Sequence, residues 1–255
     1  MISDWVKNHE TNEHTGVLLW DLSAAFDTLD VNILCQKLKL YGANDRAVRL
    51  LNSFLTNRRQ QVRIGDTLSE IKTTSIGCPQ GSLLSPLLFL VYVADVEHWV
   101  QNMKIRGYAD DTASSVHSPD IDKVTAELES NGGKILRFMA SNMLVANPDK
   151  TGLLIIRARG TTQDTRSIVL GGKIVTESPV HKILGMTINN KLTWDDHIYG
   201  KGGLISSLNS KLGAIKRISY HVPAKYTYVD NNQSPSSLKD TIWHRHLRSR
   251  PPNRE

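Results

Sequence analysis

The stretch GVLLWD, residues 16–21, decides how this sequence folds. It is almost wholly apolar and ends abruptly on Asp21, a pattern typical of a buried strand whose last residue emerges at a sheet edge or in a cleft. A carboxylate in that position is costly unless a cation or hydrogen bonds stabilise it. Asp21 is therefore the first candidate for chemistry.

A second acidic position lies where a short β-like run reaches Tyr108, passes through Asp110 and Asp111, and continues as residues 112–116. This pattern predicts a hairpin with both acids at its tip. Carboxylates at strand ends suit Mg²⁺, which prefers oxygen ligands, and two such ions can clamp an in-line phosphoryl displacement. Any one of these acids alone is more simply a solvated turn or a helix cap, so only their combination supports a metal site.

The rest of the chain alternates helical and β-like segments. Asp30 and Asn44 are predicted to cap two amphipathic helices through residues 33–40 and 48–55. Beyond them the patterns predict a hairpin of 58–64 and 68–73, a glycine loop from Gly77 leading into a mostly buried helix with Pro86 in its first turn, a helix over 120–144, strands at 152–156, 167–170, 173–175 and 183–188, and a helix from Trp194 toward Ile218.

The composition limits the class of protein. The 255 residues are 40% hydrophobic, and the net charge of +6 with a pI near 9.3 favours a polyanionic partner such as nucleic acid. Cys35 and Cys78 lack metal-ligand spacing, so neither a zinc site nor a disulfide framework is expected. Residues 1–10 lack the apolar block of a signal peptide, and the longest apolar stretch, 83–94, is shorter than the ~20 residues that cross a bilayer. We expect an intracellular protein, cytoplasmic or nuclear, that is not secreted and has no membrane partner.

Several motifs follow one another in a characteristic order: LWDLSAAFDTLD (19–30), FLTNRRQQV (54–62), GCPQGSLLSPLLFLVYVADV (77–96), YADDT (108–112), NPDKT (147–151) and KILGMTINNKLTWDDHI (182–198). Over about residues 17–216 the chain resembles the reverse transcriptase domain of a non-LTR (LINE-type) retrotransposon in truncated form. The resemblance implies an α/β (α+β) polymerase palm, with an antiparallel sheet and helices packed on one face, a partial helical thumb and largely missing fingers.

The same resemblance implies that residues 1–15 are a remnant of the fingers, 16–193 the palm and 194–228 the start of the thumb. Residues 229–255 are polar and are expected to form a disordered tail. Val31 and Phe138 stand where many relatives have histidine and tryptophan, and neither change touches the implied metal ligands.

The resemblance also assigns roles to site residues by position. Asp21, Asp110 and Asp111 would bind two Mg²⁺ ions, for which Mn²⁺ is a substitute. The carbonyl of Leu22 would lie beside the metal, and Phe26 would be an aromatic gate against a ribose 2′-hydroxyl. The remaining assignments are Gln80 and Gly81 under the incoming nucleotide and template base, and Lys150 near the leaving pyrophosphate. Taken singly, Phe26 would be interpreted as a core residue and Lys150 as a solvated surface residue. Gln80 and Gly81 would be interpreted as parts of an ordinary turn.

Basic residues suit contacts with the phosphate backbone of a nucleic acid; they are Arg58, Arg59, Lys201, Lys211, Lys216 and Arg217. A solvated basic face is an equally good interpretation of each.

The expected function is RNA-directed DNA polymerisation, with transfer of deoxynucleotides from deoxynucleoside triphosphates to the 3′-hydroxyl of a DNA primer on an RNA template. Because the fingers that hold the triphosphate are missing, this chain alone is expected to be weakly active or inactive. One alternative is a catalytically inactive retroelement remnant that acts at most as a nucleic-acid-binding or interaction module. Another is a structural or interaction protein in which the acids persist without use.

Overall fold

The computed structural model describes residues 1–22, 24–108, 111–146, 150–161 and 164–219, with side chains through residue 212. It divides the chain into two compact units, Met1–Gly200 and Lys201–Glu255, each of which is described by itself. In the described residues no helix is both long and apolar enough to cross a bilayer.

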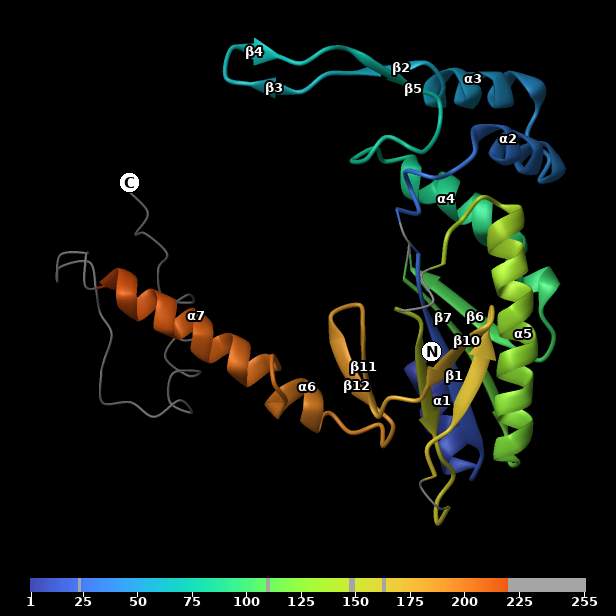
Figure 1. Ribbon diagram of the computed structural model, residues 1–255, viewed down its shortest axis with the longest axis vertical. Coiled ribbons are helices and arrows are strands. Elements are labelled where there is room, and N and C mark those ends of the chain that lie inside the picture. The colour runs from blue at the N-terminus through green and yellow to red at the C-terminus, as the bar shows by residue number, and fades with distance from the viewer. Residues whose placement is uncertain (23, 109–110, 147–149, 162–163, 220–255) are drawn as a thin grey trace, which may run out of the picture. The chain divides into compact units, whose positions relative to one another are not determined.

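The first unit is built on a four-stranded antiparallel sheet (Figure 1). Its strands lie in the order β6 (Lys104–Tyr108), β7 (Asp111–Ser118), β1 (His14–Asp21) and β8 (Gly152–Ile156). All five residues of β8 are buried, and most of β1 is buried as well, so both faces of the sheet are covered. The predicted buried strand ending at Asp21 is confirmed as β1, one of the two inner strands of the sheet.

One face of the sheet packs on the long helix α5 (Ile121–Ser141). The Asp120 carboxylate accepts hydrogen bonds from the first-turn amides of Asp122 and Lys123, so the helix begins where the sequence predicts a cap. It ends at Ser141 rather than at residue 144. A Cβ at Gly132 would lie 2.6 Å from the Leu170 side chain, which explains why glycine occupies the middle of this helix.

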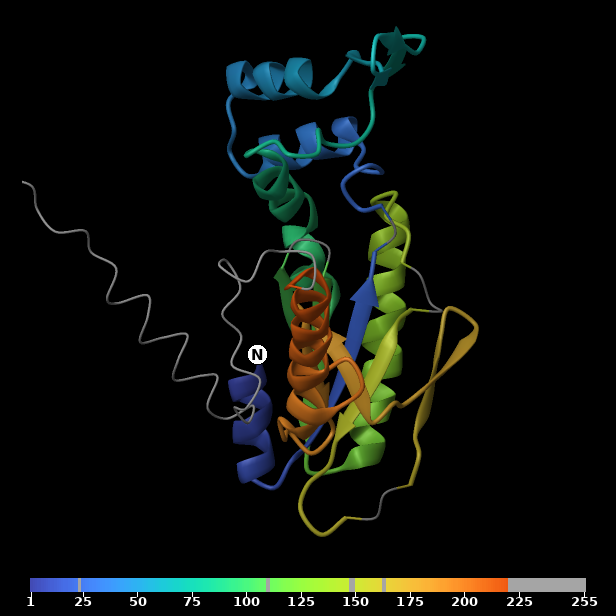
Figure 2. The same cartoon turned by 90° about the vertical axis from the view of Figure 1, so that its left-hand side faces the viewer.

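The other face is covered by α1 (Ile2–Glu10), whose Trp5 is 1% exposed and packs with Val17, Leu154 and Ile188. Figure 2 shows α1 and α5 on opposite sides of β1. The expectation of helices on one face only is therefore wrong. The reason is that one buried tryptophan anchors a short helix whose other residues are mostly polar, a pattern too weak to predict.

A smaller group of elements follows β1. It contains α2 (Val31–Leu40), α3 (Asp45–Leu55) and a two-part hairpin in which β2 (Arg58–Gln60) pairs with β5 (Lys72–Thr74) and β3 (Arg63–Ile64) pairs with β4 (Thr67–Leu68). The Asp30 carboxylate accepts from the backbone amides of Asn32 and Ile33, and the Asn44 side chain accepts from that of Ala47. Both predicted caps and the predicted hairpin are confirmed.

The helix α4 (Ser85–Val93) has Pro86 in its first turn, as predicted, and continues into the 3-10 turn η1 (Ala94–Trp99). It buries Leu88, Phe89 and Tyr92, but Leu87 is 57% exposed and Leu90 48% exposed. The prediction of a mostly buried helix is wrong, because only one side of this apolar helix packs against other elements of the first unit.

The C-terminal third contains two further corrections. The predicted strand 183–188 is a hairpin of β11 (Val180–Ile183) and β12 (Met186–Asn189), because Leu184 and Gly185 form a turn with φ of 50° and 79°. The predicted continuous helix from Trp194 is two helices, α6 (Asp195–Tyr199) and α7 (Leu204–Ser219), interrupted at a glycine-rich segment. The strands predicted at 167–170 and 173–175 are confirmed as β9 (Ser167–Leu170) and β10 (Lys173–Thr176), and the structure pairs them antiparallel.

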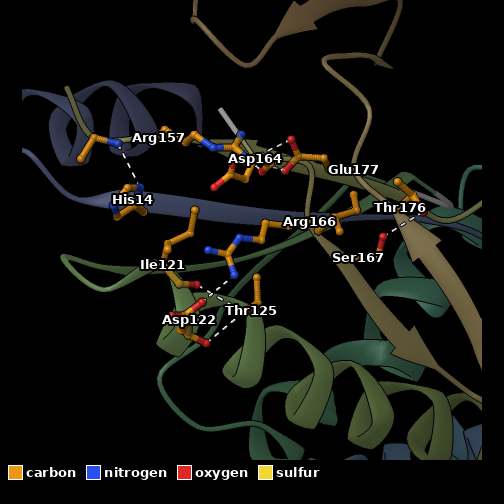
Figure 3. Close-up of polar contacts among 12 residues, drawn as sticks. His14, Ile121, Asp122, Thr125, Arg157, Asp164, Arg166, Ser167, Thr176 and Glu177 are labelled. Carbon is orange, nitrogen blue, oxygen red and sulfur yellow. Dashed lines mark hydrogen bonds and ion pairs between the residues drawn. The ribbon is translucent and has the colours of Figure 1, made fainter. Parts of the chain in front are cut away.

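A polar cluster fixes the end of the sheet where β1 begins, opposite the end that carries Asp21 (Figure 3). The Nδ1 atom of the buried His14 accepts a hydrogen bond from the backbone amide of Ala158 at 3.1 Å. The Arg157 guanidinium lies 2.9 Å from both carboxylate oxygens of Glu177. Burial and the nearby Arg157 charge lower the pKa of His14, so its neutral form is the one that the fold accommodates.

Candidate active site

Two of the three acids come together at one end of the sheet. Asp21 ends β1, Asp111 begins β7, and the two residues are register partners in the antiparallel pair. Directly opposite residues point to the same face of a sheet, with Cβ atoms about 4.5–5.5 Å apart. The carboxylates of Asp21 and Asp111 are thus placed side by side, although 90 residues separate them in the chain.

The third acid, Asp110, lies outside the described residues, as does Ala109. The strands on either side are described: Tyr108 of β6 is the register partner of Asp111 of β7. The predicted hairpin is confirmed as β6–β7, and Asp111 is the first residue of its second strand rather than part of the turn.

The strand pair is fixed next to the acids by an internal hydrogen bond. The indole Nε1 of Trp20 donates to the Oγ of Ser114 at 2.9 Å, and both side chains are buried. Trp20 directly precedes Asp21 in β1, so this bond fixes the pairing of β1 with β7 next to the two acids. The position of Asp21 relative to Asp111 is therefore set by buried, not surface, contacts.

Lys150 approaches Asp21 from the segment before β8. Its Nζ atom lies 3.2 Å from the Oδ2 atom of Asp21, and the two side chains are 65% and 44% exposed. The other residues of the NPDK motif, 147–149, lie outside the described residues. An exposed pair of this kind contributes little to stability, so its significance is that it places a cation beside the acids.

A cavity of about 330 Å³ opens at these residues. Asp21, Asp111 and Lys150 line it together with two cations absent from the sequence predictions, Arg106 of β6 and Lys182 of β11. Side chains two residues apart in a strand point to the same face, so Arg106 could have been predicted on the same face of β6 as Tyr108, next to the acids. No local signal indicates Lys182, since the fold of the β11–β12 hairpin brings it here.

The residues present fit a magnesium site. Mg²⁺ is commonly held by one or two carboxylates together with substrate phosphates, and Asp21 and Asp111 supply two carboxylates at one strand end. Within the described residues no three His, Cys, Asp or Glu side chains form a group that could hold a metal. The fit therefore rests on the carboxylate pair, with Asp110 adjacent in sequence.

The residues after Asp21 form the wall between the sheet and α4. Leu22 is buried and makes an isolated antiparallel bridge with Ala146. The Phe26 ring is half-buried, with its centroid 5.0 Å from that of Phe89 in α4. Phe26 thus combines the core contact expected of an ordinary aromatic residue with an accessible part, which a gate at the nucleotide would need.

The glycine loop is tied to this same wall by backbone hydrogen bonds. The amide of Gly77 donates to the Leu29 carbonyl at 2.8 Å, and the amide of Cys78 donates to the Phe26 carbonyl at 2.7 Å. Gly81 follows in an open loop with φ of 82°, a conformation that glycine adopts without strain. The structure therefore brings the Gln80-Gly81 loop next to Phe26.

The basic residues differ in how they are engaged. The Arg58 guanidinium donates to the backbone carbonyls of Leu55, Ile76 and Gly77, so it holds the loop in place. Arg59 is exposed. In the second unit Lys201 and Lys211 are exposed, and the side chains of Lys216 and Arg217 lie outside the described residues.

Comparisons with known proteins give a consistent result. Residues 2–188 match the family model described as "Reverse transcriptase (RNA-dependent DNA polymerase)". The chain is 29% identical over 197 residues to the probable RNA-directed DNA polymerase from transposon BS of Drosophila melanogaster, covering 74% of this chain and 22% of that protein. It is 27% identical to the RNA-directed DNA polymerase from mobile element jockey of the same species, covering 74% of this chain and 21% of that protein. The chain thus spans about a fifth of the length of these relatives.

Solved structures with a similar fold include two telomerases. One, from Candida albicans in complex with a fragment of telomeric RNA, has a TM-score of 0.51 at 18% identity and covers 75% of this chain and 32% of that one. An apo telomerase from Candida tropicalis has a TM-score of 0.52 at 15% identity and covers 76% of this chain and 37% of that one. At these identities the similarity concerns the fold.

Proposed function

Since this chain belongs to the reverse transcriptase (RNA-dependent DNA polymerase) family, we propose that the cavity at Asp21 and Asp111 is the centre of RNA-directed DNA synthesis. The proposed reaction transfers a deoxynucleotide from its triphosphate to the 3′-hydroxyl of a DNA primer on an RNA template. Such substrates place the activity inside the cell, in the cytoplasm or the nucleus. The observation that carries the proposal is the register pairing of Asp21 with Asp111 beside Lys150.

Asp21, Asp110 and Asp111 are the residues that would hold divalent cations here. Two Mg²⁺ ions, or Mn²⁺ in their place, would activate the attacking hydroxyl and neutralise the leaving pyrophosphate. The two paired carboxylates would bind and orient the cations on one face of the sheet. The cavity in front of them is then open to phosphate oxygens. Their fixed geometry supplies the alignment on which phosphoryl transfer depends.

Three cations line the cavity, and each has a proposed role set by its position. Lys150, now paired with Asp21, can turn to the developing negative charge on the pyrophosphate and donate a proton from its ammonium group. Arg106 and Lys182 face the same cavity from β6 and β11 and are placed to neutralise backbone phosphates of the primer strand. The Arg106 guanidinium also lies 3.8 Å from the Asp4 carboxylate of α1.

The wall of the cavity supplies selectivity in this proposal. Phe26 excludes a ribose 2′-hydroxyl, and the Gln80-Gly81 loop supports the incoming nucleotide. Arg59, Lys201, Lys211, Lys216 and Arg217 remain candidates for phosphate contacts. The contacts of Arg58 with backbone carbonyls support a role in loop placement instead.

The proposed domain division is a palm over residues 16–193 and the start of a thumb over 194–228. The boundary between the two compact units, after Gly200, supports a division in this part of the chain but groups α6 with the first unit. Residues 1–10 pack on the sheet through Trp5, which favours including α1 in the palm rather than assigning 1–15 to the fingers. Residues 229–255 lie outside the described residues.

The test is primer extension on an RNA template with deoxynucleotides and Mg²⁺ or Mn²⁺, together with calorimetric titration of the cation. We expect Asp21→Asn and Asp111→Asn to weaken cation binding and abolish extension. Asp66→Asn, at the exposed tip of the β3–β4 hairpin, is the matched control and should change neither. Measurable extension that is equal in the wild type and Asp21→Asn would overturn the proposal, whereas cation binding without extension by the wild type would favour a nucleic-acid-binding module that has lost catalysis.

A further inference from the structure

Asp27, one residue after Phe26, makes a side-chain contact that the proposed polymerase chemistry does not use. The Nε2 atom of Gln80 lies 3.0 Å from Oδ1 and 3.1 Å from Oδ2 of the Asp27 carboxylate. The two residues are 53 positions apart, on the loops that follow β1 and precede α4. The contact therefore joins the two walls of the proposed nucleotide site.

This contact determines which end of the Gln80 amide faces outward. A carboxylate accepts hydrogen bonds and does not donate them, so the amide nitrogen of Gln80 must face Asp27. The amide oxygen, on the opposite branch of the planar group, then points away from Asp27. Gln80 is exposed, and in the described part of the chain its oxygen receives no hydrogen bond, so an acceptor is presented to a ligand.

The backbone around the contact makes it part of a rigid connection. The Cys78 amide donates to the Phe26 carbonyl, and the Gly77 amide donates to the Leu29 carbonyl. The segment 77–80 is thus joined to the segment 26–29 on both sides of Asp27. A shift of the carboxylate would be transmitted to Gln80 while the loops remain paired.

We propose that Asp27 is a positioning residue of the nucleotide site, which holds the Gln80 amide with its oxygen outward. The loop then offers an acceptor to a hydrogen-bond donor of the incoming nucleotide, a sugar hydroxyl or a base amino group, and not to its triphosphate, whose oxygens are themselves acceptors. This inference rests on the proposed function, because it assumes that a nucleotide occupies the site.

The test compares Asp27→Asn with the wild type and with the control Asp66→Asn. Asparagine keeps the size of Asp27 but can both donate and accept, so it no longer dictates the orientation of Gln80. The first measurement is the side-chain amide resonance of Gln80 in a ¹⁵N–¹H spectrum, identified by its loss in Gln80→Glu. We expect the resonance to move in Asp27→Asn and to stay in place in Asp66→Asn.

The second measurement is primer extension with varied deoxynucleotide concentration in Mn²⁺. Misorientation of one exposed acceptor should raise KM about three- to tenfold in Asp27→Asn, with kcat within about twofold of the wild type. A role in folding alone would lower the amount of active protein and leave KM unchanged. Nucleotide titrations followed in the same spectra replace KM if extension is too slow to quantify.

The outcomes separate this inference from the polymerase proposal. An unmoved Gln80 resonance, or a moved resonance with unaltered nucleotide affinity in Asp27→Asn, overturns the role of Asp27 alone. A wild-type chain that neither extends primers nor responds to nucleotide overturns the proposed function and this inference with it. A moved resonance together with weaker nucleotide binding supports both.

Discussion

Replacing Gly77 by alanine tests whether the glycine loop is held against the segment after β1 as the structure describes. Gly77 has φ of 72°, and an added Cβ would lie 2.6 Å from the Asp27 carbonyl oxygen and 2.8 Å from that of Phe26. Backbone atoms cannot move aside as a flexible side chain can. Alanine should therefore separate the loop from residues 26–27.

The cost can be assembled from the contacts that would be lost. The left-handed conformation costs alanine about 1–2 kcal/mol. Separation breaks the Gly77 to Leu29 and Cys78 to Phe26 hydrogen bonds, each with a net contribution of about 1 kcal/mol. The free energy of unfolding should fall by about 3–4 kcal/mol in total, which lowers the melting temperature by about 10 °C for a domain of this size.

The assay is urea unfolding followed by circular dichroism, with the slope of the transition checked for constancy. Gly81→Ala is the matched control, because Gly81 has φ of 82° but nothing within 4 Å of an added Cβ. It should lose only the backbone contribution of about 1–2 kcal/mol. Equal losses in the two variants, or a Gly77→Ala protein as stable as the wild type, would refute the close approach of the two loops.

Three further changes test other parts of the molecule. Trp5→Ala should lower the free energy of unfolding by about 3–5 kcal/mol, measured in urea, because Trp5 is the largest buried side chain between α1 and the sheet; a loss under about 1 kcal/mol would contradict that packing. The pKa of His14 is lowered by burial and by Arg157, so the unfolded chain binds a proton that the folded chain does not. Stability should then decrease as pH falls below about 6.5, and urea midpoints should decrease less in His14→Gln. Lys150→Met removes the cation 3.2 Å from Asp21 and should tighten calorimetric Mn²⁺ binding by up to about fivefold while slowing primer extension; weaker Mn²⁺ binding would contradict the ion pair.

Interactions between residues only a few positions apart could be predicted from the sequence alone. The Asp30, Asn44 and Asp120 caps are bonds from a side chain to amides two or three positions later, so residue type and spacing specify them. Pro86 in the first turn of α4 follows the same logic. The strand ending on Asp21 could be predicted because burial on both faces leaves an uninterrupted apolar run.

Contacts between distant segments required the folded chain. Trp5 and Lys182 gave no periodic signal that would place them on the sheet or in the cavity. The alternation of β6 could place Arg106 on one face of its strand, but only the folded chain shows that this face borders the cavity. The run 183–188 has the pattern of one strand, but Leu184 and Gly185 adopt positive φ and turn it into the hairpin of β11 and β12. Local pattern indicated that Asp21 and Asp111 lie at strand ends. Only the hydrogen-bonded register between β1 and β7, which depends on pairing across 90 residues of chain, places their carboxylates on the same face.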